Sequence, residues 1–361
     1  MRGRLLKPLL LARPSRFAGT ARGGARRLLA ALALVLLGAA ALATNPRMDI
    51  DSGADLMLRQ AVIDGVRSGG NYYTVAADAL RSGGHGLLPF AASLPTLPVI
   101  AAHTPSFALR IMAWALGIAV ALAWHKRLSP ALASGTGRAA ASLLLIGGMT
   151  ALIGSEATIM PEMWAGLLIA LSLALRGGGR MIEAIAIGLA AALLQEIASL
   201  YLLLMAALAW RDGERREAVG WFCAVAIFAA VLGFHLHAAH RTAWPIEAAP
   251  LWQMPGPGFA LGALASASAL AALPLALGAP LAMLAIAGWS AWRDPLAVRT
   301  AATLAGFVVL TAIFAPAGNA DWALLITPVS LVGLGFIIDG VRDLVAAALR
   351  HRRITVTRVA R

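Results

Sequence analysis

Three aspartates early in the chain have the spacing that best suits acid–base chemistry. Asp49, Asp51 and Asp55 follow an apolar stretch, residues 28–44, by five to eleven residues. If that stretch crosses a membrane, these side chains lie close to the lipid headgroups. A carboxylate there can take a proton from a hydroxyl acceptor while a leaving group carried by a lipid approaches from the bilayer. Partial removal of water would raise its pKa towards a useful value.

The same residues have a structural alternative. Ser52-Gly-Ala-Asp55 has the spacing of a capping box, in which Asp55 would bind backbone amides at the start of a helix. The spacing alone favours this capping role over catalysis.

Two amphipathic helices are predicted to position these side chains. Over 55–67 one stripe is apolar, and the polar residues face away; 72–81 repeats the pattern with Tyr72 at its start. Gly69-Gly70 and Gly83-Gly84 follow the two segments. We expect both helices to lie on the membrane surface and to roof the outer mouth of a helical bundle.

The amino-acid composition indicates the fold class of the whole chain. Hydrophobic residues make up 60% and charged residues 13%, with a mean hydropathy of +0.78, far from the averages of soluble domains. This predicts an all-α, polytopic transmembrane bundle of about ten spans over 28–340, between basic tails at 1–27 and 341–361. The apolar runs are 28–44, 107–124, 139–153, 163–175, 181–210, 218–236, 259–292, 300–315 and 322–338.

The net charge of +13 has its source mainly in the tails. Eight Lys and Arg residues lie in 1–27 and six in 342–361, as the positive-inside rule expects of two cytoplasmic termini in an inner membrane. Nucleic-acid binding is therefore not predicted, and the absence of a phosphate-cradling glycine motif argues against nucleotide donors. A retained signal anchor is the preferred interpretation of the N-terminus.

Two apolar runs leave the topology open. Residues 181–210 either cross twice, as short or bent helices that break at Gln195-Glu196, or form one long tilted helix. Charge favours the first alternative, in which 259–292, interrupted by Pro274 and Pro280, crosses once. The tryptophans predicted as interface anchors are Trp124, Trp210, Trp244, Trp252 and Trp322.

Three motifs together resemble the GT-C superfamily of membrane glycosyltransferases. They are an acidic residue after the first span, the segment Asn71-Tyr72-Tyr73 to Arg81 followed by Leu88-Pro89-Phe90, and Pro161-Glu162-Met163-Trp164 with the Gln195-Glu196 step. The resemblance covers the N-terminal third, with support to about residue 210. The family's usual Asp-Glu doublet is absent, because Leu56 follows Asp55, and the chain has no room for a large outer C-terminal domain.

The resemblance implies transfer of a sugar from a polyprenyl-phosphate carrier in the membrane to an acceptor hydroxyl, without a cofactor. It makes Asp55 the first candidate for the base and Asp51 the second. It further implies that the leaving phosphate is neutralised by a basic residue, and that two tyrosines position sugar or prenyl surfaces. The residues concerned are Arg59, Arg81 and Arg241 for the phosphate, and Tyr72 and Tyr73 for the surfaces.

Other polar residues in apolar surroundings complete the predicted site. Glu156 and Glu162 bracket a short outer turn and would bind acceptor hydroxyls or a divalent cation, although Glu162 also suits the start of a helix. Glu196 at membrane depth serves either the site or a helix–helix hydrogen bond. Asp321 is interpreted first as a helix cap and second as a cavity residue. His235, His237 and His240 have weak ligand spacing, so no metal site is predicted.

Two other functional classes stay open. A transporter of lipid-linked intermediates would need polar residues along a path through the bilayer, and the spans offer little beyond Gln195-Glu196. A non-catalytic membrane partner in polysaccharide or glycolipid assembly would need no base at all.

Overall fold

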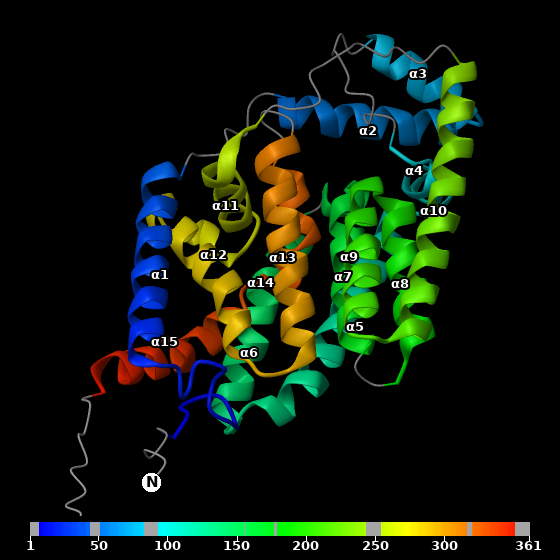
Figure 1. Cartoon of the computed structure of the whole chain (residues 1–361). Helices are drawn as coiled ribbons and strands as arrows, with labels where there is room; N and C mark the ends of the chain where they lie inside the picture. The colour runs from blue at the N-terminus through cyan, green and yellow to red at the C-terminus, as the bar shows by residue number, and fades with distance from the viewer. Residues whose placement is uncertain are drawn as a thin grey trace, which may run out of the picture.

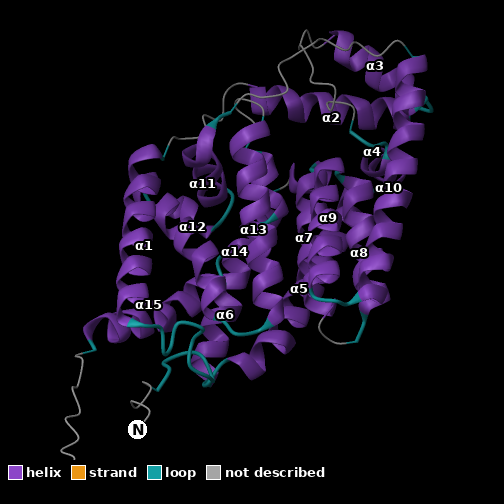
Figure 2. Cartoon of the chain, in the orientation of Figure 1, coloured by secondary structure: helices purple, strands orange, loops and turns teal. Residues whose placement is uncertain are grey.

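The computed structural model describes residues 7–43, 51–82, 93–154, 156–176, 179–242, 254–315 and 320–350. These residues form helices joined by turns, as Figure 2 shows, with one isolated β-bridge between Leu11 and Leu132. The predicted all-α fold is therefore confirmed for this part of the chain.

The described ranges contain fifteen α-helices, labelled in chain order. Their bounds are α1 Arg22–Leu42, α2 Asp51–Arg67, α3 Tyr72–Ser82, α4 Thr96–His103, α5 Ser106–Leu128, α6 Gly135–Gly148, α7 Pro161–Arg176, α8 Met181–Leu194, α9 Ser199–Arg211, α10 Arg215–Arg241, α11 Gly256–Ser266, α12 Leu275–Gly288, α13 Pro295–Phe314, α14 Thr327–Ser330 and α15 Gly333–Leu349. Short 3₁₀ turns η1 to η7 connect several of them, including η3 Glu156–Ile159, η4 Glu196–Ala198, η5 Ala269–Ala272 and η7 Asp321–Leu325.

The bundle has two distinct ends (Figure 1). Helices α2 and α3 lie across one of them, with α4 beneath, and we call this the cap end. Helix α15 lies crosswise at the opposite end beside residues 7–21, and we call this the tail end. The two amphipathic helices predicted from the sequence are thus confirmed, and they cover one end of an otherwise apolar bundle.

Within the described part of the chain, four helices are long and apolar enough to cross a membrane: Arg22–Leu42, Ser106–Ala131, Arg215–Arg241 and Pro295–Phe314. Met181–Leu194 and Leu275–Ala291 are shorter apolar helices. The first three long helices bury only 11 to 22% of their apolar windows within the protein. Such outward apolar faces fit contact with lipid. The total of about ten spans stays a prediction.

Residues 181–210 form two short helices, α8 and α9, and the single tilted helix is wrong. The break falls at Gln195, whose backbone is extended (φ −140°, ψ 116°), and Glu196 opens the turn η4. With 14 and 13 residues, each helix is about 20 Å long. Gly188 allows α8 to pack closely against α9 and α10, because a Cβ at this position would meet the rings of Tyr201 and Trp221.

Residues 256–288 also divide into two short helices, which together run from the cap end to the tail end. At the cap end, the backbone N–H of Met254 donates to the carbonyl of Ile313 (3.1 Å). At the tail end, Arg293 Nε donates to the carbonyl of Ser15 (2.9 Å). Pro274 directly precedes α12 and Pro280 lies inside it. This path agrees with the preferred single passage through 259–292.

Two sequence predictions are corrected by packing. The run 322–338 is not one straight helix, because it divides into η7, α14 and the start of the crosswise α15. Close backbone contact of Gly166 with Leu324 holds η7 against α7. Trp124 is not an interface anchor: it is fully buried, and its indole N–H donates to the carbonyl of Ala170 (2.9 Å). Trp210 stays exposed, and Trp244 and Trp252 lie outside the described residues.

The N-terminal segment is packed into the tail end. Three consecutive backbone N–H groups, at Leu9, Leu10 and Leu11, donate to the carboxylate of Asp339 at 2.6, 2.9 and 2.8 Å. Ser15 donates to Asp343 through both its backbone N–H (3.1 Å) and its hydroxyl (2.7 Å). These bonds tie residues 9–15 to α15, so this part of the predicted tail belongs to the folded bundle.

Candidate functional site

Arg59 is the centre of a group of polar side chains beneath α2 at the cap end. Its Nη1 and Nη2 donate to the two carboxylate oxygens of Glu162, at 3.0 and 3.1 Å. A second carboxylate, Asp55, lies 3.0 Å from Nη2. Glu162 is buried and also accepts from the amide of Gln195 at 2.6 Å. Arg59 therefore links α2 to α7 and to the α8–α9 turn.

Local structure explains how these side chains meet. Asp55 and Arg59 are four residues apart, so they share one face of α2. Glu162 lies in the first turn of α7, after Pro161, where the helix dipole favours a negative charge. Gln195 can reach Glu162 because the helix ends at Leu194. The dipole and site interpretations of Glu162 are thus compatible.

The charges around Arg59 shift its own pKa. Burial by itself lowers the pKa of a guanidinium, but the neighbouring Glu162 and Asp55 carboxylates more than offset this, so the pKa of Arg59 is raised. Arg59 is therefore a permanent positive charge within this group.

Two more carboxyl groups interact electrostatically with Arg59 and Glu162. Burial, with a contribution from Glu162, raises the pKa of Asp321 in η7 to about 7, although Arg59 opposes the shift. Glu196 in η4 accepts a hydrogen bond from the backbone N–H of Leu94. A carboxyl group that titrates near neutral pH can both accept and release a proton under physiological conditions.

Tyr72 and Tyr73 begin α3, and Tyr72 interacts electrostatically with Glu196 and Arg59. Tyr72 and Tyr73 make an edge-to-face contact with ring centroids 5.3 Å apart. The Tyr72 hydroxyl donates to the carbonyl of Ser93, and burial, followed by charges that include Glu196, raises the Tyr72 pKa. Tyr73 lies instead against His235 of α10, with its hydroxyl 3.3 Å from Nδ1.

Three of the predicted site residues lie elsewhere. Arg81 pairs with Asp78 and donates to the carbonyl of Thr242 at 3.2 Å. Arg241 is exposed at the end of α10, and Glu156 is exposed in η3. Within the described part of the chain, the hydrogen bonds and ion pairs found for these three do not reach Arg59.

Asp49 and Asp51, which precede Asp55 in the chain, are only partly described. Asp51 opens α2, but its side chain lies outside the described residues, as do Asp49 and Leu88-Pro89-Phe90. Because α2 starts at Asp51, Asp55 lies a full turn inside the helix, and its carboxylate binds the Arg59 guanidinium. The side chains of residues 51–54 lie outside the described residues, so the capping-box interpretation of Asp55 stays a prediction.

The histidines of α10 point in different directions. His235 is buried against Tyr73, whereas His237 and His240 are exposed. Among the described residues there is no group of three or more His, Cys, Asp or Glu side chains arranged to hold a metal ion.

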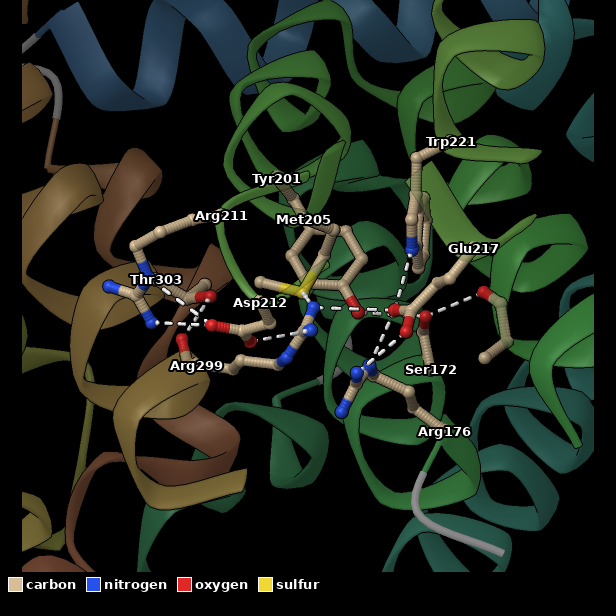
Figure 3. Close-up of polar contacts among 11 residues, drawn as sticks. Ser172, Arg176, Tyr201, Met205, Arg211, Asp212, Glu217, Trp221, Arg299 and Thr303 are labelled. Atoms are coloured by element: carbon tan, nitrogen blue, oxygen red, sulfur yellow. Dashed lines mark hydrogen bonds and ion pairs between the residues drawn. The ribbon is translucent and has the colours of Figure 1, made fainter. Parts of the chain in front are cut away.

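A second polar cluster lies at the tail end (Figure 3). Arg176 donates to both oxygens of Glu217 at 2.5 and 2.6 Å, and Arg299 approaches the same carboxylate at 3.3 Å. Arg299 also pairs with Asp212 at 3.0 Å, and the indole N–H of Trp221 donates to Glu217 at 3.0 Å. These contacts join α7, α9, α10 and α13.

The two clusters differ in what they offer to chemistry. In the tail-end cluster both oxygens of Glu217 already accept N–H donors, and Arg299 is only 1% exposed. Because the Glu217 carboxylate is fully occupied, this network holds helices in place. At the cap end the Asp55 side chain is 39% exposed, and burial raises the pKa of the neighbouring Asp321 to about 7. The cap end is therefore the candidate functional site.

Sequence reasoning identified four members of this site, Asp55, Arg59, Glu162 and Glu196, without the contacts among them. For Asp321 it preferred the role of a helix cap and gave the role of a cavity residue second place. It treated Gln195 only as part of a motif and did not find the tail-end cluster.

No protein-family model, curated protein or solved structure matches this chain.

Proposed function

We propose that the cap end is the active site of a membrane glycosyltransferase-like protein. In this proposal, a sugar passes from a polyprenyl-phosphate carrier to an acceptor hydroxyl on the outer face of the inner membrane. The observation that carries the proposal is the group of carboxyl side chains around Arg59, held beneath amphipathic helices at the end of an apolar bundle.

The proposed reaction is a single displacement. A carboxylate removes the proton of the acceptor hydroxyl, the hydroxyl oxygen bonds to the anomeric carbon, and the bond from that carbon to the phosphate oxygen breaks. The polyprenyl phosphate leaves with the bonding electrons, and the anomeric configuration inverts.

Asp55 remains our first candidate for the base, with Asp51 second. Asp55 is the more accessible acid bound to Arg59, since its side chain is 39% exposed against 3% for Glu162. Asp321, whose pKa is raised to about 7 by burial, can accept the proton afterwards. Arg59 holds Asp55 in place and is therefore a positioning residue.

The charge distribution supports the proposed orientation. All but five of the described Lys and Arg residues lie at the tail end or on the helix ends that face it; the five at the cap end are Arg59, Arg67, Arg81, Arg110 and Arg241. By the positive-inside rule, the tail end and both termini face the cytoplasm and the cap end faces outward. About ten membrane passages would then surround the site.

The class of sugar donor that the protein uses tests this proposal. The purified full chain, reconstituted in proteoliposomes, would be given radiolabelled sugars on polyprenyl phosphate and, separately, the corresponding nucleotide sugars. We expect transfer from the lipid donors only. Transfer from nucleotide sugars, or no transfer across a broad donor and acceptor panel, would contradict the proposal and favour the role of a non-catalytic assembly partner.

A further inference from the structure

A hollow of about 530 Å³ lies at the cap end between α2, α4, the start of α5 and η3. Its size falls within the range of small-molecule sites. The polar residues that line it are Gln60, Arg67, His103, Thr104, Ser106 and Thr158. None of them belongs to the group of carboxyl side chains around Arg59.

The hollow adjoins that group along the chain and in space. Gln60 directly follows Arg59 in α2, and Thr158 lies one turn before Glu162. Arg67 is two turns further along α2 from Gln60. A molecule in the hollow would therefore have one end beside α2 at the level of Arg59.

Arg67 is held in place with hydrogen-bonding capacity to spare. It donates to the carbonyls of Ala101 (3.2 Å) and Ala102 (3.3 Å), and it pairs with Asp64 at 2.7 Å. A guanidinium has five N–H donors, so these three bonds leave two. The opposing Asp64 carboxylate is about half exposed, so water screens much of its charge.

His103 supplies a second group suited to an anion. Its Nδ1 lies 2.9 Å from the carbonyl of Val99, so Nδ1 carries the proton and Nε2 is left for another partner. Protonation would turn Nε2 into a donor. The hydroxyls of Thr104 and Ser106 line the same hollow and can donate as well.

An apolar, exposed surface continues from the hollow. Val99 and Ile100 of α4 are 36% and 41% exposed, and Phe107 and Ile111 of α5 are 68% and 64% exposed. In a bundle that spans a membrane, such side chains face lipid. A ligand with an anionic head and a long apolar chain therefore fits this location better than a soluble anion does.

We propose, on the basis of the function proposed above, that this hollow binds the phosphate of a membrane-borne prenyl phosphate, with Arg67 and His103 as its donors. Charge-assisted bonds from a guanidinium and an imidazolium are the interactions that phosphate oxygens prefer. The assignment differs from the sequence-based candidates: Arg59 is occupied by Glu162 and Asp55, while Arg81 and Arg241 lie towards α3 and the end of α10.

Binding in detergent separates the sources of this ligand. Farnesyl phosphate, farnesol and inorganic phosphate would be titrated against the full chain and followed by isothermal calorimetry. The variants are Arg67→Gln, Arg67→Lys and His103→Gln, with Arg216→Gln of α10 as an exposed control at the tail end. We expect farnesyl phosphate to bind, at least tenfold weaker binding in Arg67→Gln and His103→Gln, partial recovery in Arg67→Lys and no change in Arg216→Gln.

Each binding result either supports or overturns the assignment of this phosphate site. Equal binding of farnesol, or binding that neither Arg67→Gln nor His103→Gln weakens, would overturn the assignment. If inorganic phosphate binds as tightly as farnesyl phosphate, the hollow is an anion site, but the proposal that its ligand is a membrane-borne prenyl phosphate is overturned. His103→Gln keeps the test valid if Arg67→Gln unfolds α4. Transfer activity with no effect of these variants would leave the proposed function standing and remove only this site.

Discussion

The Arg59–Glu162 pair offers a quantitative test of the cap-end architecture. Glu162 has a side chain only 3% exposed, with bonds from Arg59 at 3.0 and 3.1 Å and from Gln195 at 2.6 Å. Arg59→Gln removes the compensating charge and leaves Glu162 buried beside Asp321. Breaking a buried ion pair in this way costs about 3 to 5 kcal/mol of unfolding free energy. We expect a loss of that size at pH 7.5.

A double-mutant cycle isolates the pair. Glu162→Gln alone leaves an uncompensated Arg59, while Arg59→Gln/Glu162→Gln removes both charges. The double variant should therefore be more stable than the sum of the single losses predicts, by about 2 kcal/mol or more. Arg81→Gln is the matched control, because Arg81 pairs with Asp78 in exposed positions, where such bridges contribute about 0 to 1 kcal/mol.

Equilibrium unfolding in mixed detergent micelles, with retained helix content as the signal, would give these free energies. A loss below about 1 kcal/mol in Arg59→Gln would place this pair in the class of surface bridges. A coupling free energy near zero in the cycle would likewise refute the idea of a buried, mutually dependent pair.

Three further predictions follow from other contacts. Glu217→Gln should cost about 3 to 5 kcal/mol of unfolding free energy in the same assay, because it leaves Arg176 and Arg299 without their shared carboxylate. A loss below about 1 kcal/mol would contradict the stabilising role of the tail-end cluster. Between about pH 4 and 7 the unfolding free energy should fall as the pH rises, by up to about 1.4 kcal/mol per pH unit for Asp321, because its folded pKa of about 7 exceeds the ordinary 3.8. Asp321→Asn should flatten that slope, and an unchanged slope would refute the shift. Gly166→Ala should cost about 1 to 3 kcal/mol, because a Cβ there would meet the backbone of Leu324; a melting temperature equal to that of the wild type would contradict this close approach.

Local patterns were enough to predict much of the fold. The amphipathic stripes of α2 and α3 and the polar Gln195-Glu196 step within an apolar run are visible in short windows of sequence. Periodicity and charge asymmetry act over a few residues, so they can be recognised without knowledge of packing.

The features that were missed depend on packing between distant segments. A hydropathy pattern cannot distinguish Trp124 from a tryptophan that faces lipid. In the structure, the Trp124 indole N–H donates to a carbonyl inside the bundle. Asp321 lies far from Asp55 in the chain, and only the arrangement of η7 against α7 brings it near Arg59. The division of 322–338 follows from close glycine contacts, which no single-segment pattern encodes.

The measurement that tests the central claim most directly is the rate of sugar transfer by Asp55→Asn in proteoliposomes. Asp78→Asn serves as the control, since Asp78 lies on α3 in an exposed pair with Arg81. A positioned general base contributes about 10² to 10⁴-fold to a rate. We predict a loss of that size in Asp55→Asn, with a melting temperature close to that of the wild type and near-normal transfer in Asp78→Asn. Transfer at the wild-type rate in folded Asp55→Asn would contradict the proposed site.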